Sequence, residues 1–162
     1  MPMSRTLFGF LLICLVACQP SEHPRLSDYA MGTLTLPTGY SFYVYIAATD
    51  FQRKKGLSGI TKDSFPSDRG MLFIYQEMAL RHFWMPETHF DLDIVFMKSD
   101  FEIIDIQRQL KHFPYSASEG EVPRSKPVSS QFVLEVKSGS ILANQLHIGE
   151  KLVFDANNNP DL

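Results

Sequence analysis

The chain has almost no cysteine. Its two cysteines, Cys14 and Cys18, both lie near the amino terminus, and none occurs among the residues that follow. Without thiols, the region after Cys18 has no internal disulfide, no thiolate ligand for a metal and no cysteine nucleophile. The fold of this region must therefore be stabilised by its hydrophobic core, which a hydrophobic content of 44% is sufficient to build.

The sequence also lacks the charge pattern and the motifs of several functional classes. The formal net charge is −3, the pI is about 5.9 and no basic stripe is present, which argues against a nucleic-acid partner. There is no Gly-x-Ser-x-Gly nucleophile elbow and no glycine-rich loop of the kind that binds phosphate. Ser58 stands between glycines, but it follows the end of an expected helix and is interpreted as a loop residue.

The hydrophobic run at the amino terminus is too short to span a bilayer as a helix, which takes about 20 residues. It extends from Leu7 to Ala17 after the basic Arg5, and this arrangement is typical of a secretory signal. The run ends in Leu15-Val16-Ala17-Cys18, which resembles a bacterial lipobox. The resemblance implies cleavage before Cys18 and attachment of lipid to its thiol. The alternative is an ordinary signal peptide with an incidental cysteine.

Lipid on Cys18 would anchor the protein in a membrane of the bacterial envelope. The next residue is Gln19 rather than Asp, which by enteric-type sorting indicates the periplasmic face of the outer membrane, with the inner membrane and the cell surface as alternatives. Four parts are therefore expected: a lipoprotein signal peptide at 1–17, a lipidated tether at 18–29, a single β-rich domain at 30–155 and a frayed tail at 156–162.

Alternating apolar and polar residues predict a mainly β (α+β) fold, a small antiparallel barrel or sandwich with one to three short helices. Thr49 and Gln52 fit a capping box for a helix that ends at Gly56, and Ser140 is expected to cap a second helix over 141–146. A proline-containing loop is expected over 111–128. The expected strands cover residues 31–36, 41–47, 71–75, 80–85, 91–98, 101–107, 131–137 and 151–154.

The candidate site lies in the stretch from Gly70 to Lys98, which holds the only tryptophan, Trp84. This ring is either an aromatic platform for a flat ligand or the plug of the core, since Trp suits a border between water and an apolar wall. Asp93 either offers a directional acceptor to a ligand or accepts hydrogen bonds from backbone amides. Glu135 interrupts an apolar strand and is expected to be buried. The predicted ligand-binding residues are Trp84, Met85, Thr88, Asp93 and Met71, with Arg53 and Glu135 as a supporting pair.

Three functions are compatible with these residues. The preferred one is a non-catalytic domain that binds a small molecule or an envelope protein. The second is a hydrolase-type enzyme acting on envelope or glycan material through Asp93 with Asp91 or Glu135. The third is a periplasmic copper protein, because thioether and imidazole ligands suit Cu(I). No catalytic residue, metal ligand or cofactor is assigned, and the oligomeric state is left open. The copper alternative draws on Met71, Met78, Met85 and Met97 with His82 and His89.

A series of short motifs runs through the chain: Gln52-Arg53-x-x-Gly56-Leu57, Gly70-Met71-Leu72-Phe73, Phe83-Trp84-Met85, Leu92-Asp93-Ile94-Val95-Phe96, Val133-Leu134-Glu135 and Ile148-Gly149. In this order they resemble the Domain of Unknown Function 192 family, over roughly Thr33 to Phe154. The resemblance implies a compact, mainly β domain that is often exported in bacteria. It brings no established activity, so it bears on fold and location and leaves function open.

The chain departs from the family pattern in the loop after the tryptophan. Where members usually have Lys-Asn-Thr, this sequence has Pro86-Glu87-Thr88. Ser58 likewise replaces a usual Met after Gly-Leu, and Phe90-Asp91 replaces Ile-Pro. The lost lysine and the gained Glu87 are expected to disfavour an anionic ligand at this loop.

Overall fold

The structure is a computed structural model that describes residues 25–116, 118 and 120–157. Several predicted features lie outside these residues: the signal peptide at 1–17, the lipidation site Cys18, the tether up to residue 24 and the tail from residue 158. The account that follows concerns the described residues only.

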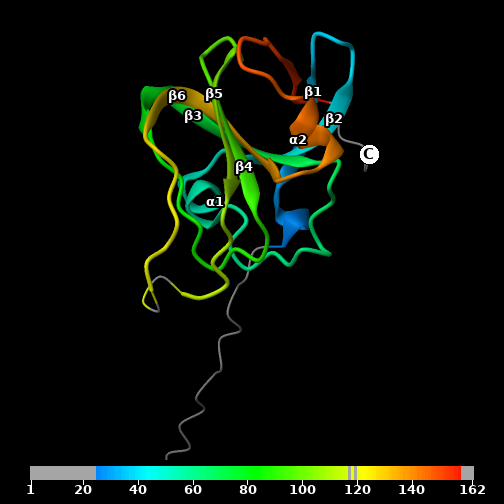
Figure 1. Cartoon of the computed structure of the whole chain (residues 1–162). Coiled ribbons are helices and arrows are strands. Elements are labelled where there is room, and N and C mark those ends of the chain that lie inside the picture. Colours follow the sequence, from blue (N-terminus) through cyan, green and yellow to red (C-terminus); the bar gives the residue numbers. More distant parts are fainter. Residues whose placement is uncertain (1–24, 117, 119, 158–162) are drawn as a thin grey trace, which may run out of the picture.

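The described chain forms one seven-stranded sheet with two short α-helices (Figure 1). The strand order across the sheet is β5-β4-β6-β3-β2-β1-β7. A mainly β fold with one to three short helices is therefore confirmed. The strands are β1 (Ala30–Thr35), β2 (Ser41–Ala47), β3 (Gly70–Arg81), β4 (Leu92–Met97), β5 (Ile103–Leu110), β6 (Val128–Lys137) and β7 (Val153–Asp155).

One strand pair makes the sheet mixed rather than purely antiparallel. β2 and β3 run parallel, with Tyr45 opposite Met71. The connection between them, residues 48–69, is long enough to carry the chain back to the starting end of the sheet, as a parallel pair requires. Over the described residues the sheet does not close into a barrel, although an isolated bridge joins Glu102 to Lys151 near its two edges. The sandwich-like form of the two that were expected is the one found.

The helices begin where their capping residues predict. Helix α1 (Asp50–Lys55) has a capping box, in which the Gln52 amide donates to Thr49 Oγ1 at 3.2 Å and the Thr49 amide donates to Gln52 Oε1 at 3.1 Å. It ends at Gly56, whose φ of +48° favours glycine. Helix α2 (Ile141–Gln145) is capped by Ser140, which accepts from the Ala143 amide at 3.0 Å.

The central stretch folds differently from its prediction. Instead of two strands at 71–75 and 80–85, there is the single strand β3, which pairs with β6 on both sides of an irregularity between Ile74 and Ala79. The residues around Trp84 leave the sheet and pair with the proline-containing loop. The Met85 amide donates to Pro123 O at 3.1 Å, and Phe83 O accepts from the Ser125 amide at 2.8 Å. This pairing fixes the orientation of Trp84.

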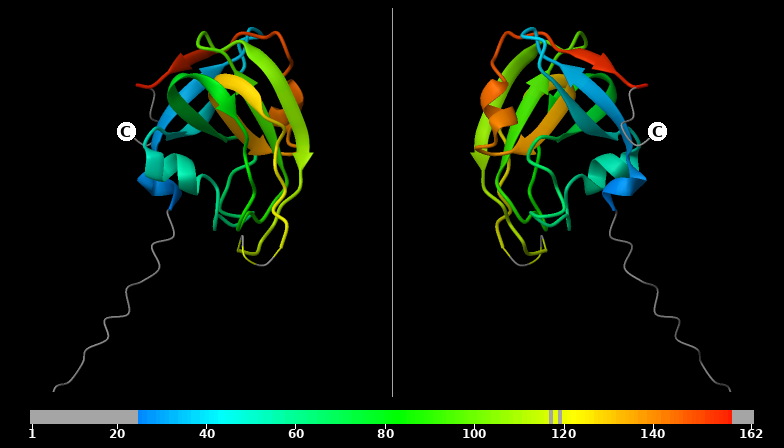
Figure 2. Two further views of the ribbon diagram at one scale, coloured as in Figure 1. Left: turned by 90° about the vertical axis from the view of Figure 1, so that its left-hand side faces the viewer. Right: turned by 90° about the vertical axis from the view of Figure 1, so that its right-hand side faces the viewer.

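Two apolar layers cover the two faces of the sheet, and α1 and α2 lie on opposite sides of it (Figure 2). The layer that includes Leu57, just after α1, also holds Phe73 and Phe96, and we call its side the α1 face. The other layer includes Leu142 of α2 and Leu134, and we call its side the α2 face. Because side chains alternate along a strand, neighbours in the sequence lie on different faces.

The end of the sheet near α1 carries the long loops and the start of the described chain (Figure 1). A short 3-10 helix, η1 (Leu26–Asp28), leads into Tyr29, which is 5% exposed. The Tyr29 hydroxyl donates to Gly56 O at 3.2 Å. Residues 26–29, which the sequence analysis placed in the tether, therefore pack against the domain.

Candidate functional site

Glu135 is a buried carboxyl group without a partner. It lies in β6 on the α1 face, opposite Met71 of β3 and Ile94 of β4, and it is only 4% exposed. No hydrogen bond or ion pair reaches its carboxyl group from the residues that the structure describes. Burial raises the pKa of Glu135 to about 8. The group is therefore largely protonated at neutral pH, and it can both donate and accept a hydrogen bond.

The expected pair between Arg53 and Glu135 is wrong. The Arg53 guanidinium donates to Ile74 O at 2.9 Å and to Ala48 O, and it forms an ion pair with Asp50. The last turn of α1 brings Arg53 over the carbonyl groups of Ala48, just after β2, and of Ile74 in β3, and these hydrogen bonds satisfy its guanidinium group. Arg53 still lines the space in front of Glu135, but it does not neutralise the carboxyl group.

A glycine keeps space in front of the Glu135 carboxyl group. A Cβ atom at Gly56 would lie 4.0 Å from Glu135 Oε2 and 3.1 Å from Phe73 Cζ. Nearby, burial raises the pKa of Tyr29 to about 12, with a further contribution from the Glu135 charge. Tyr29 uses its hydroxyl proton on Gly56 O, so it does not donate to Glu135. The sequence pattern predicts Gly56 only as a helix end and gives no sign of this second role.

A small cavity of about 40 Å³ opens in front of Glu135. Leu57, Phe83 and Leu92 give it apolar walls, none of which was predicted. The volume suits one small group, such as a hydroxyl or a carbonyl, rather than a ring. Of the predicted ligand-binding residues, this cavity brings together Arg53, Trp84, Met85, Thr88 and Glu135.

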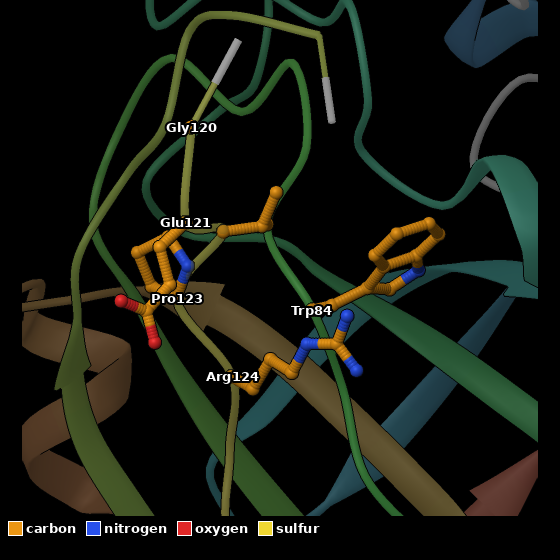
Figure 3. A pocket seen from close by; sticks show the side chains of 6 residues that line it. Trp84, Gly120, Glu121, Pro123 and Arg124 are labelled. Atoms are coloured by element: carbon orange, nitrogen blue, oxygen red, sulfur yellow. The ribbon is translucent and has the colours of Figure 1, made fainter. Parts of the chain in front are cut away.

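Trp84 stands at the rim of this cavity and also borders a second, open hollow of about 670 Å³ (Figure 3). It is 43% exposed, whereas its neighbours Phe83 and Met85 are buried, so it is not the plug of the core. On the other side of the hollow is segment 120–124. The Arg124 guanidinium lies beside the indole, 5.6 Å from the ring centre, while the Glu121 side chain points away from it.

The remaining predicted residues near Trp84 have local structural partners. Thr88 and Ser58 both donate their hydroxyl protons to Pro86 O, at 3.4 Å and 2.8 Å. Their free lone pairs remain acceptors toward the cavity that both residues line. Met71 is fully buried in the α1-face layer, behind Glu135, and does not line the cavity.

Asp93 belongs to a different part of the molecule. It lies on the α2 face, where it accepts from Arg108 Nη1 at 2.8 Å and from the Gln109 amide at 2.9 Å. Arg108 also donates to Ala143 O and Leu146 O at the end of α2. Asp93 is thus a buried structural acceptor that fastens α2 to the sheet, as the alternative interpretation held. The structure does not bring it to Trp84 or Glu135.

Asp91 does not pair with Asp93 either. Its carboxylate accepts from Lys111 at 2.8 Å and from the His112 ring at 2.7 Å. Partial burial would raise the pKa of Asp91, but the hydrogen bonds from Lys111 and His112 outweigh it and keep the pKa well below its usual value. Neither acid pair that the hydrolase alternative needs is therefore assembled among the described residues.

The side chains of the copper alternative are also dispersed. Met71 and Met85 are buried on the α1 face and Met97 is buried on the α2 face. His82 and His89 are exposed and do not share a side with Met85. Within the described ranges, no group of three or more His, Cys, Asp or Glu side chains is placed to hold a metal ion.

Sequence and structure comparisons give one family and two neighbours. The model of family DUF192, described as "Uncharacterized ACR", matches residues 33–154. A crystal structure of a proposed transcription regulator from Sinorhizobium meliloti is similar, with 27% identity, a TM-score of 0.60, and coverage of 78% of this chain and 95% of that one. A protein of unknown function from Novosphingobium aromaticivorans has 25% identity and a TM-score of 0.59, covering 76% and 83%. No curated protein matches the sequence.

Proposed function

The chain belongs to the DUF192 family of uncharacterised proteins, and from its site we propose that it is a non-catalytic binding domain of the bacterial envelope. In this proposal a small molecule binds at the cavity of Glu135 and the hollow beside Trp84. The proposal includes the lipid anchor at Cys18.

The unpartnered Glu135 is the observation that carries this proposal. Burying a polar group without a hydrogen bond costs roughly 1–3 kcal/mol in proteins. Among the described residues the fully enclosed side-chain atoms without a partner are Thr33 Oγ1 and Ser130 Oγ, whereas the Glu135 carboxyl group opens onto the cavity. Glu135 faces a cavity of the size of one small group, and an inserted hydroxyl or carbonyl would supply the missing partner. A binding function thus gives a reason for retaining the carboxyl group in an apolar layer.

Trp84 supplies the second part of the site. An exposed indole beside an open hollow offers a large, rigid contact surface at little cost in conformational entropy. Its backbone is held by the pairing of residues 83–85 with residues 123–125, so the ring is positioned before a ligand arrives. The site is positioned in advance and holds one unpaired carboxyl group. A glycoside hydrolase uses two carboxyl groups, so the arrangement favours a receptor.

The start of the described chain agrees with a role at a membrane. No described helix is both long and apolar enough to cross a bilayer. In this proposal the lipid on Cys18 attaches the protein to the membrane. Six residues lie between Cys18 and Arg25, and the seven steps from one to the other reach at most about 25 Å. The described chain begins at the loop end of the sheet (Figure 1), and Tyr29 there donates to Gly56 O. The anchor would therefore hold the binding site close to the membrane, on the periplasmic side of the outer membrane.

The test is native mass spectrometry of the full-length protein, exported in a bacterium and extracted in mild detergent. A reproducible extra mass on the protein, absent from Trp84→Ala and retained in Tyr40→Ala, is the expected result. Tyr40 is a matched control because it is an exposed aromatic residue in the β1–β2 turn. The same spectra report lipid on the mature amino terminus. If repeated preparations carry no extra mass, and no compound of a small-molecule library adds mass to the protein, the binding proposal fails.

A further inference from the structure

Basic side chains line the site of the proposed function. Arg53, Lys54 and Lys55 line the cavity of Glu135, and Arg124 lines the hollow beside Trp84. Of these, only Arg53 has an acidic partner, Asp50, within the described part of the chain. The gathering of positive charge is local, because the whole chain carries a formal net charge of −3.

Helix geometry explains only some of these cations. Arg53, Lys54 and Lys55 fall in the last turn of α1, where basic residues complement the helix dipole. Arg124 is in a different segment and lies against the Trp84 ring, where it lines the second hollow. Its position has no role in capping the helix. Two separate elements thus contribute positive charge to two hollows that share Trp84 as a wall.

The acidic groups nearby do not cancel this charge. Burial keeps Glu135 protonated at neutral pH, so the cavity floor is neutral. Glu121 borders the hollow but points away from Trp84 and Arg124 (Figure 3). Glu87, which was expected to disfavour an anion, is in neither set of lining residues, and its backbone bonds to Gly59 and Tyr115 hold it in the loop.

From this arrangement we infer that the ligand is a small organic acid. Its anionic group would lie at Arg124 and the lysines of α1, its ring face on Trp84, and one hydroxyl or carbonyl group in the cavity of Glu135. This inference rests on the proposed function and adds the chemical class of the ligand. A ligand amine is excluded by the same charges, since an ammonium group would meet several cations and a neutral carboxyl group.

The chain provides its own reporter for the test. Trp84 is the only tryptophan, so its indole N–H resonance in a nitrogen-labelled sample reports on this site alone. Two matched series of probes are titrated into the full-length protein in detergent micelles. One is D-glucuronate, D-glucose and D-glucosamine. The other is 4-hydroxybenzoate, 4-hydroxybenzyl alcohol and 4-hydroxybenzylamine. In at least one series we expect the acid to bind at least tenfold more tightly than the neutral compound, and the amine to bind least.

Substitutions locate the anion. Arg124→Gln and Lys55→Gln should each reduce the preference for the acid at least threefold while leaving the affinity for the neutral compound unchanged. Lys62→Gln is the control, because Lys62 lines a separate hollow with His89, Asp91, His112 and Lys137. Glu135→Gln should keep the preference for the acid, whereas Glu135→Leu should weaken acid and neutral compounds alike. Raising the salt concentration should narrow the difference between acid and neutral compound.

The outcomes separate this inference from the binding function. Neutral or amine probes that shift the Trp84 resonance as strongly as the acids would overturn the acid inference and leave a binding site. The acid inference would also be overturned if Lys62→Gln lost the preference for the acid while Arg124→Gln kept it. The anion would then bind in the hollow that Lys62 lines. If no acid of either series shifts the resonance, the inference fails, and the mass-spectrometric result then decides whether any ligand is bound.

Discussion

Asp93 and Glu135 lie one register position apart on neighbouring strands, yet their carboxyl groups are on opposite faces of the sheet. Asp93 pairs with Val136 across β4 and β6, and Ile94 pairs with Glu135. One carboxylate has a guanidinium and a backbone amide as partners, and the other has none. Two acidic residues that are close in the strand register thus have unrelated roles. The following predictions test each role separately.

The substitution Asp93→Asn should destabilise the protein by about 2–3 kcal/mol, because it weakens two hydrogen bonds to a buried carboxylate. Arg108 would be left with a weaker partner at the end of α2. Urea denaturation measures the effect as a lower midpoint with an unchanged slope. Asp50→Asn is the control, since the Asp50 side chain is fully exposed. Ligand binding in Asp93→Asn should be normal, and a selective loss of binding would return Asp93 to the site.

Glu135 should make the protein less stable as the pH rises. Its folded-state pKa of about 8 lies above the ordinary value of 4.5, so between these values the folded state holds a proton that the unfolded state has lost. Stability from this group is complete below pH 4.5 and falls by about 1.4 kcal/mol per pH unit up to about pH 8. Urea denaturation from pH 5 to pH 9 should show this slope, and Glu135→Gln should remove it.

Asp91 provides a comparison for Glu135, because its pKa is shifted in the opposite direction. The lowered pKa of Asp91 means that its contribution is present above its unfolded value and is lost only as the pH falls through the acidic range. Asp91→Asn should therefore leave the slope between pH 5 and pH 9 unchanged. A wild-type stability that does not differ in pH dependence from that of Glu135→Gln would contradict the burial of an unpartnered carboxyl group.

The local features of this fold could be predicted from the sequence, whereas the contacts between distant segments could not. Thr49 with Gln52 and Ser140 mark helix starts through hydrogen bonds to residues three positions away, so the sequence contains both partners. Side chains alternate between the two faces of a strand, so the sequence likewise predicts that Asp93 and Ile94 lie on opposite faces of the sheet. The parallel pairing of β2 with β3 depends on where a long connection returns, which no short pattern specifies.

The candidate site was predicted in part for the same reason. Trp84, Met85 and Thr88 were found because they stand together in an aromatic stretch. Arg124 was missed because a proline-containing loop shows no periodicity, and only its pairing with residues 83–85 brings it to the indole. Arg53 was assigned the wrong partner, since backbone carbonyls at Ala48 and Ile74 have no signature in side-chain types.

Gly56→Ala should both strain the backbone and fill the space before Glu135. A positive φ costs a residue with a Cβ atom roughly 1–3 kcal/mol, and the new methyl group would lie against Phe73. Gly39→Ala is the matched control, because Gly39 also has a positive φ but nothing lies within 4 Å of its added Cβ. Both variants should lose stability in urea denaturation. Only Gly56→Ala should lose ligand binding, and equal binding in the two would argue against the cavity as the binding site.

Trp84→Ala and Phe83→Ala should differ sharply in stability, although the residues are adjacent. Phe83 is 7% exposed and packs edge-on against Phe73 with the ring centres 4.8 Å apart, so its removal should cost about 3–5 kcal/mol. Trp84 is 43% exposed and contacts Arg124, so Trp84→Ala should cost less, about 1–2 kcal/mol. Thermal unfolding followed by circular dichroism compares the two. A loss in Trp84→Ala as large as that in Phe83→Ala would make the indole a core residue. A small loss of stability combined with a loss of ligand binding would make the indole a wall of the site. In that case the side chain contributes little to folding, and its main contact is with the ligand.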